Sequence, residues 1–88
     1  MTNDQVSIEA TRLALKFIAS TDHDDNERSF FLALKSTDDP TERMSIAFHA
    51  TRILAMKIRE AAEHADQLDL VLERVSLTLA QMLLEEDQ

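Results

Sequence analysis

The residues best suited to chemistry lie in one polar run, Asp22-His23-Asp24-Asp25-Asn26-Glu27. Side-chain oxygens at its first, third and fifth positions match the first half of a helix-loop-helix calcium loop. Such a loop also needs glycine at position 6 and a bidentate glutamate at position 12, where this chain has Glu27 and Ala33. We therefore interpret the run as a helix cap within a solvated loop.

Other chemical constellations are absent from the sequence. His23, His49 and His64 have no metal-ligand spacing, and there is no cysteine to complete a zinc site. Without glycine there is no phosphate-binding loop, dinucleotide fingerprint or nucleophile elbow. We therefore expect no catalytic residue, no cofactor and no metal ion, and a protein that is not an enzyme.

One helical face between residues 49 and 64 is mainly polar. A mixed group of side chains lies within about 120° on a helical wheel: His49, Arg52, Met56, Glu60, Glu63 and His64. Two interpretations remain open for them. They form a polar recognition strip, or they are the solvated side of a helix with charge pairs such as Arg59 with Glu63.

The elements that position these residues are predicted to be helices. Apolar residues at helical spacing indicate a first helix over about 5–20, capped by Asn3 or Asp4, and a second over about 25–36. The run Asp39-Pro40-Thr41-Glu42 combines an N-cap, a proline at the first helical position and a capping-box glutamate. A third helix should therefore begin at residue 40.

From Met44 onward, apolar residues follow a heptad repeat to Met82. One interpretation is a single helix of roughly 45 residues in a coiled coil, near 70 Å long at 1.5 Å per residue. The other is a pair of helices over about 40–63 and 67–86, with Asp66 as the N-cap of the second. We favour the break near residues 64–67, because helices of such length are uncommon.

The fold class is all-α: a small bundle of three to four helices with a long heptad-patterned C-terminal half. We expect one domain over residues 1–88, with short flexible ends at 1–4 and 86–88. The core should contain the larger apolar residues of each helix: Phe17, Phe30, Phe31, Leu34, Phe48, Leu54, Ile58, Leu72, Val75 and Leu79.

The C-terminal half carries a second apolar row opposite the first, and an 88-residue monomer has little surface with which to cover both. We therefore expect a homodimer or a stable protein partner. The residues assigned to that contact are Ile46, Ile53, Met56, Leu70, Leu77 and Leu84.

The formal net charge of −8 restricts the partners further. It opposes loose binding to nucleic acid or to anionic membranes and favours a partner with a basic surface. No apolar run approaches the roughly 20 residues that span a bilayer, and no signal-peptide core follows the acidic start, so we expect a cytoplasmic protein.

The predicted function is a non-catalytic protein-binding module, an adaptor, regulator or inhibitor that acts through an apolar helix face or an acidic surface. The alternative is a nucleic-acid-linked regulator. It would be either a helix-turn-helix dimer that reads DNA through Arg43 and Arg52, or a DNA mimic that blocks a basic groove. A mimic needs acids arrayed along an exposed face, whereas here they gather at 22–27, 38–42 and 85–87.

Overall fold

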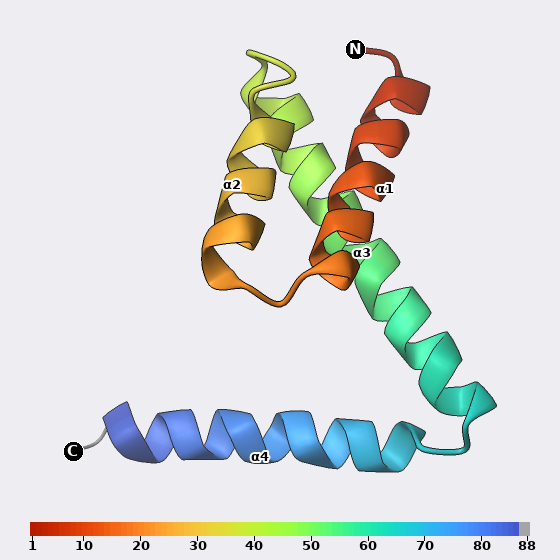
Figure 1. Cartoon of the computed structure of the whole chain (residues 1–88), viewed down its shortest axis with the longest axis vertical. Helices are drawn as coiled ribbons and strands as arrows, with labels where there is room; N and C mark the ends of the chain where they lie inside the picture. Colours follow the sequence, from red (N-terminus) through yellow and green to blue (C-terminus); the bar gives the residue numbers. More distant parts are fainter. Residues whose placement is uncertain (87–88) are drawn as a thin grey trace. The chain divides into compact units, whose positions relative to one another are not determined.

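The computed structural model describes residues 1–86, which form four α-helices and no strand (Figure 1). They are α1 (Asn3–Ala19), α2 (His23–Leu34), α3 (Pro40–His64) and α4 (Leu68–Glu86). The predicted all-α class, a small helical bundle, is confirmed. Residues 87 and 88, in the end predicted to be flexible, lie outside the described residues.

The helix starts show where local sequence acts. Thr2 is the N-cap of α1: its hydroxyl accepts the Gln5 N–H at 3.2 Å, and the Gln5 side chain accepts the Thr2 N–H at 2.8 Å. This capping box corrects the predicted cap at Asn3 or Asp4, and it brings residues 3 and 4 of the predicted flexible end into the helix. Asp22 caps α2 by accepting the Asp24 N–H at 2.8 Å.

The start of α3 at Pro40 is confirmed, and Asp39 accepts the Thr41 N–H at 2.9 Å. The predicted capping box is wrong in its second half. Glu42 accepts hydrogen bonds from the Thr37 hydroxyl at 2.5 Å and from the Met1 amino group at 2.8 Å, while the Asp39 N–H donates to Thr37 instead. The glutamate thus links the α2–α3 loop to the start of the chain.

The chain divides into two compact units, residues 1–56 and 57–88. The expectation of one domain over 1–88 stays a prediction. In the first unit, α1 and α2 lie side by side and the first part of α3 passes behind them (Figure 1). Its core cluster consists of Val6, Ala10, Leu13, Ala33, Ile46 and Ala50.

Half of this core cluster is alanine. Ala10, Ala33 and Ala50 are buried where the helices approach, and Phe17, Phe30 and Ile53 pack against the cluster from its edge. The predicted positions of Phe17 and Phe30 are thus partly confirmed, and Leu34 and Leu54 are half-buried. Six predicted core residues are wrong, because they are more than half exposed: Phe31, Phe48, Ile58, Leu72, Val75 and Leu79.

In the second unit, α3 ends at His64 and α4 begins at Leu68, so the predicted break is confirmed. The turn is a Schellman motif. The Gln67 N–H donates to the Ala62 carbonyl at 2.7 Å and the Asp66 N–H to the Glu63 carbonyl at 3.1 Å, with Asp66 in the left-handed region at φ 56°.

This turn changes the role of Asp66. The sequence predicted Asp66 as the N-cap of the following helix, whereas it is the residue that terminates α3. The first residue of α4 is Leu68, and the Val71 N–H donates to the Gln67 carbonyl at 3.0 Å, which places Gln67 at the N-cap position.

Among residues 1–86, none of the four helices combines the length and the hydropathy that a membrane span requires.

Candidate functional site

The apolar surface of α4 is exposed within its own unit, residues 57–86. None of its residues 68–86 is buried, yet eight large apolar side chains of this helix are at least 42% exposed. The broader of its two apolar faces, which we call the α4 stripe, spans an arc of about 80°. Its members are Leu68, Leu72, Val75, Leu79 and Met82.

The second apolar face of α4 lies about 180° around the helix from the stripe. We call it the α4 outer row; it consists of Leu70, Leu77 and Leu84, which are 42%, 57% and 67% exposed. These residues are spaced by seven, so their side chains line up along the helix. A helix that is apolar on two opposite sides is normally covered on both. The outer row therefore meets the requirement for a docking surface.

The other three residues predicted for the dimer or partner contact differ in their burial. Ile46 is fully buried in the core cluster of the first unit, which corrects its assignment to an interface. Ile53 is half-buried against the same cluster. Met56 is 55% exposed and remains available. The second apolar row that the sequence showed in α3 is thus partly a core row.

The residues of the predicted polar strip are all exposed: His49, Arg52, Glu60, Glu63 and His64. Two of them form ion pairs along the helix. Arg59 Nε lies 2.8 Å from Glu63, as the sequence predicted, and Lys57 Nζ lies 3.3 Å from Glu60. Exposed pairs of this kind contribute little to stability. These two ion pairs match the interpretation of a solvated helix side with charge pairs along it.

The two arginines of the alternative DNA-reading function differ in their surroundings. The Arg43 guanidinium donates from Nε to the Thr37 carbonyl at 2.8 Å and lies 3.8 Å from Asp38. These contacts fasten the α2–α3 loop to the start of α3. Arg52 is exposed on α3. Of the two side chains, only that of Arg52 points to solvent without such an anchoring bond among the described residues.

The run at 22–27 acts mainly as a helix start. Apart from the Asp22 cap, His23 lies 3.3 Å from Glu27 one turn along α2. His23, Asp24 and Glu27 bring one ligand atom each within 4.8 Å of the others, and all three are exposed. Acidic side chains in the first turn of a helix interact favourably with the backbone N–H groups that have no partner there. Capping explains the acids of this run.

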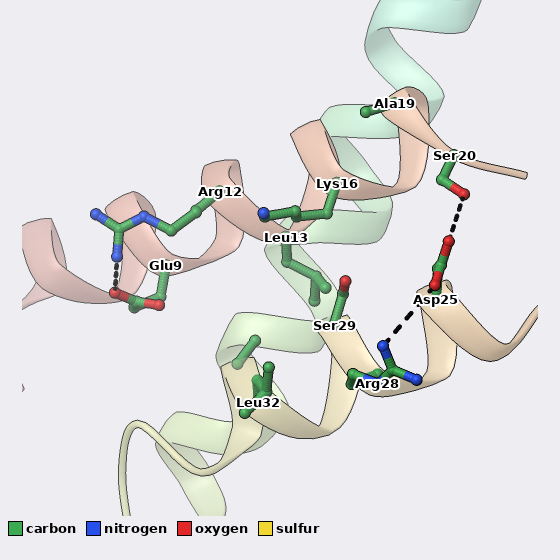
Figure 2. Close-up of a pocket in the computed structure, with 11 residues that line it drawn as sticks. Glu9, Arg12, Leu13, Lys16, Ala19, Ser20, Asp25, Arg28, Ser29 and Leu32 are labelled. Carbon is green, nitrogen blue, oxygen red and sulfur yellow. Dashed lines mark hydrogen bonds and ion pairs between the residues drawn. The ribbon is translucent and has the colours of Figure 1, made fainter. Parts of the chain in front are cut away.

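A pocket of about 480 Å³ that no pattern in the sequence predicts lies between α1 and α2 (Figure 2). Buried Leu13 and Ala33 contribute to its lining, while the basic side chains Arg12, Lys16 and Arg28 lie at its edge. In Figure 2, Arg12 turns to Glu9, at 2.7 Å, and Arg28 to Asp25, at 4.0 Å. Both arginines are thus compensated on their own helix.

The pocket shares its apolar lining with the contact between α1 and α2, so helix packing already accounts for it. Its residues come from α1, α2 and Ser20 between them, and each helix contributes both acidic and basic side chains. No spacing in the sequence marks them as a group. The α4 outer row, by contrast, follows from a simple spacing of seven.

The carboxylate of Glu42 is held by two groups from other parts of the first unit. The Met1 ammonium, by its hydrogen bond, and then the Thr37 hydroxyl lower the pKa of Glu42 below its ordinary value. Both interactions favour the ionised form. The cause is a contact that holds the first unit together, so this pKa reports on structure.

Comparisons with protein-family models, with curated proteins and with solved structures found no match to this chain.

Proposed function

We propose that this chain is a non-catalytic, acidic protein-binding module of the cytoplasm, an adaptor, regulator or inhibitor that binds its partner through the α4 outer row. The observation that carries the proposal is the exposure of Leu70, Leu77 and Leu84 along one side of a helix with no buried residue. An amphipathic helix that lays aligned apolar residues into a groove is a recurrent mode of protein recognition.

The charge of α4 defines the complementary surface. The helix carries Asp69, Glu73, Glu85 and Glu86 against Arg74 alone. A partner groove with an apolar floor and lysine or arginine at its rim would match both the row and these carboxylates. Such complementarity speeds association and selects the partner, and salt screens it. Binding should therefore weaken as the salt concentration rises.

The test is capture of the partner by the tagged full chain from the host lysate, followed by titration of the purified partner. Leu77→Asp should abolish stoichiometric capture while the helical content of the chain stays unchanged. Thr78→Asp adds the same charge about 100° around the helix from Leu77, away from the outer row, and should retain the partner. Equal capture by Leu77→Asp and the wild type would overturn the proposal.

A titration with duplex DNA separates the alternative. A helix-turn-helix reader binds duplex with a steep salt dependence that Arg52→Ala reduces. A DNA mimic competes with DNA for the captured partner and weakens when the acids at 22–27 are neutralised. A module that binds through the outer row is insensitive to both changes. Either of the first two results would replace the proposed function.

A further inference from the structure

We propose that the α4 stripe pairs with the α4 stripe of a second copy of the chain, in antiparallel orientation, and leaves the outer row free for the partner. The proposal concerns the opposite face of the helix that carries the proposed function, and it stands or falls separately. It places the dimer contact on Leu68, Leu72, Val75, Leu79 and Met82, not on the row that the sequence analysis assigned to it.

The stripe is better suited to pairing than the outer row. Its five residues follow the alternating three- and four-residue spacing of a coiled-coil seam, whereas the outer row has one residue per two turns. Val75, Leu79 and Met82 are 66%, 58% and 62% exposed in the chain. Large apolar side chains that are exposed together mark a surface at which proteins associate.

A second copy fits because the seam is flanked by uncharged residues. The positions beside the stripe are Val71, Ser76, Thr78 and Leu83, with charges only toward its ends. Two chains of net charge −8 repel each other overall, but this face brings few of those charges together. Two acidic chains can therefore pair through this neutral apolar seam with little charge repulsion between them.

The ends of the helix select the antiparallel orientation. Glu86 follows Met82 at the next seam position, and Glu85 lies beside it. A parallel pair would place both Glu86 side chains in one layer, at the negative ends of two helix dipoles, with no basic residue in the last turn. An antiparallel pair instead separates the two Glu86 side chains and brings them toward the positive end of the other helix dipole, where Asp69 is the acid of the first turn.

The spacing of the stripe is also nearly symmetric about Val75. Leu68 and Met82 lie seven residues on either side of it, and Leu72 and Leu79 lie three and four residues away. In an antiparallel pair, Leu68 therefore faces Met82, Leu72 faces Leu79, and Val75 faces its own copy. This is the twofold arrangement in which one patch is used twice.

The first test is the mass in solution, measured by sedimentation of the full chain at tens of micromolar. The wild type should sediment at twice 10.0 kDa. Val75→Asp should reduce the mass to that of one chain, whereas Leu77→Asp, the same substitution on the outer row, should leave the dimer intact. A wild type that is monomeric, or a dimer that survives Val75→Asp, would overturn the proposal.

Salt distinguishes this contact from the one with the partner. Because like charges repel across the dimer, the dimer dissociation constant should decrease as salt rises, while binding of a basic partner should weaken. The two effects have opposite signs, so failure of one proposal does not imitate failure of the other. A dimer that weakens with salt would contradict the neutral seam.

Disulfide trapping tests the orientation, and the absence of native cysteine makes each introduced thiol unique. Leu68→Cys chains mixed with Met82→Cys chains should give the mixed disulfide in preference to either homodimer. Two Met82→Cys thiols in an antiparallel pair lie about 21 Å apart along the axis, since 14 residues rise 1.5 Å each. Efficient Met82–Met82 trapping would show a parallel pair and overturn the proposal. Leu84→Cys, on the outer row, is the control that should not cross-link.

Discussion

The two units use apolar residues in opposite ways. Residues 1–56 bury a compact cluster in which alanines let three helical segments approach closely, whereas the described part of 57–88 buries only Ala62. Yet α4 carries the more regular apolar pattern, with leucine, valine and methionine on its stripe. In the first unit, alanines lie beside the large buried residues where the helices approach, whereas the large apolar side chains of α4 stay exposed and indicate a surface for another molecule.

The largest effect should come from the core of the first unit. Ile46→Ala removes three methyl or methylene carbons from a fully buried position and should lower the free energy of unfolding by about 2–5 kcal/mol. Phe48→Ala, at a side chain 62% exposed on the same helix, is the control and should cost much less. Urea unfolding followed by circular dichroism measures both. Equal losses would contradict the assignment of the core.

Truncation of the α4 stripe should give a loss that depends on concentration. Leu79→Ala removes an exposed side chain, so it should hardly change stability at submicromolar protein, where we expect the proposed dimer to be dissociated. At tens of micromolar it should cost about 1–3 kcal/mol per chain, because the dimer then buries that side chain. Thermal melts at both concentrations provide the measurement. A loss that is the same at both would place Leu79 in the core of the chain.

The turn that ends α3 should respond to a glycine by a smaller amount. Asp66 holds a left-handed conformation that glycine adopts without steric cost, so Asp66→Gly should stabilise the turn by up to about 1 kcal/mol. Asp66→Val should destabilise it by at least as much, since a β-branched residue is strongly disfavoured at positive φ. Hydrogen exchange of the Gln67 amide reports on the turn. Increased protection in the valine variant would contradict this account.

The smallest effect concerns pH and the first unit alone. The folded-state pKa of Glu42 is lowered, so its contribution is present above the ordinary glutamate pKa of about 4.3 and is lost as pH falls through the lowered value. Glu42→Gln should therefore melt earlier than the wild type at pH 6 and converge with it in strong acid. Glu85→Gln controls for the loss of one negative charge. A melting difference that persists unchanged at pH 2 would contradict the role of its carboxylate.

Local signals carried most of the fold prediction. The proline after Asp39 predicted the start of α3, and the polar residues at 22–27 predicted a helix boundary there. The break at 64–67 followed from Asp66, although through the wrong mechanism: the sequence suggested a side-chain cap, and the structure uses the backbone of this residue at positive φ. Asp suits both roles, so its type alone does not distinguish them.

The core and the candidate site were less predictable, because both depend on how helices pack. Size suggested Phe31 and Phe48 for the core, whereas Ala10 and Ala50 occupy it, since close helix approach requires small side chains. The spacing of Ile46 and Ile53 suggested a second, exposed apolar row on α3, but Ile46 faces the core. The outer row of α4 could be predicted, because a spacing of seven places residues on one side of any helix. The pocket between α1 and α2 could not, since its lining residues meet only after those helices pack.

The central claim is that the α4 stripe is covered by a second molecule and not by its own chain. Hydrogen exchange of the full chain at about 0.5 µM and about 200 µM tests it most directly, because the first unit provides an internal reference. Amides of Leu72 to Met82 should exchange faster at the lower concentration, while those of Ala10 and Leu13 keep the same protection at both. Equal and strong protection of α4 at both concentrations would contradict the account, because it would show that the chain covers the stripe itself.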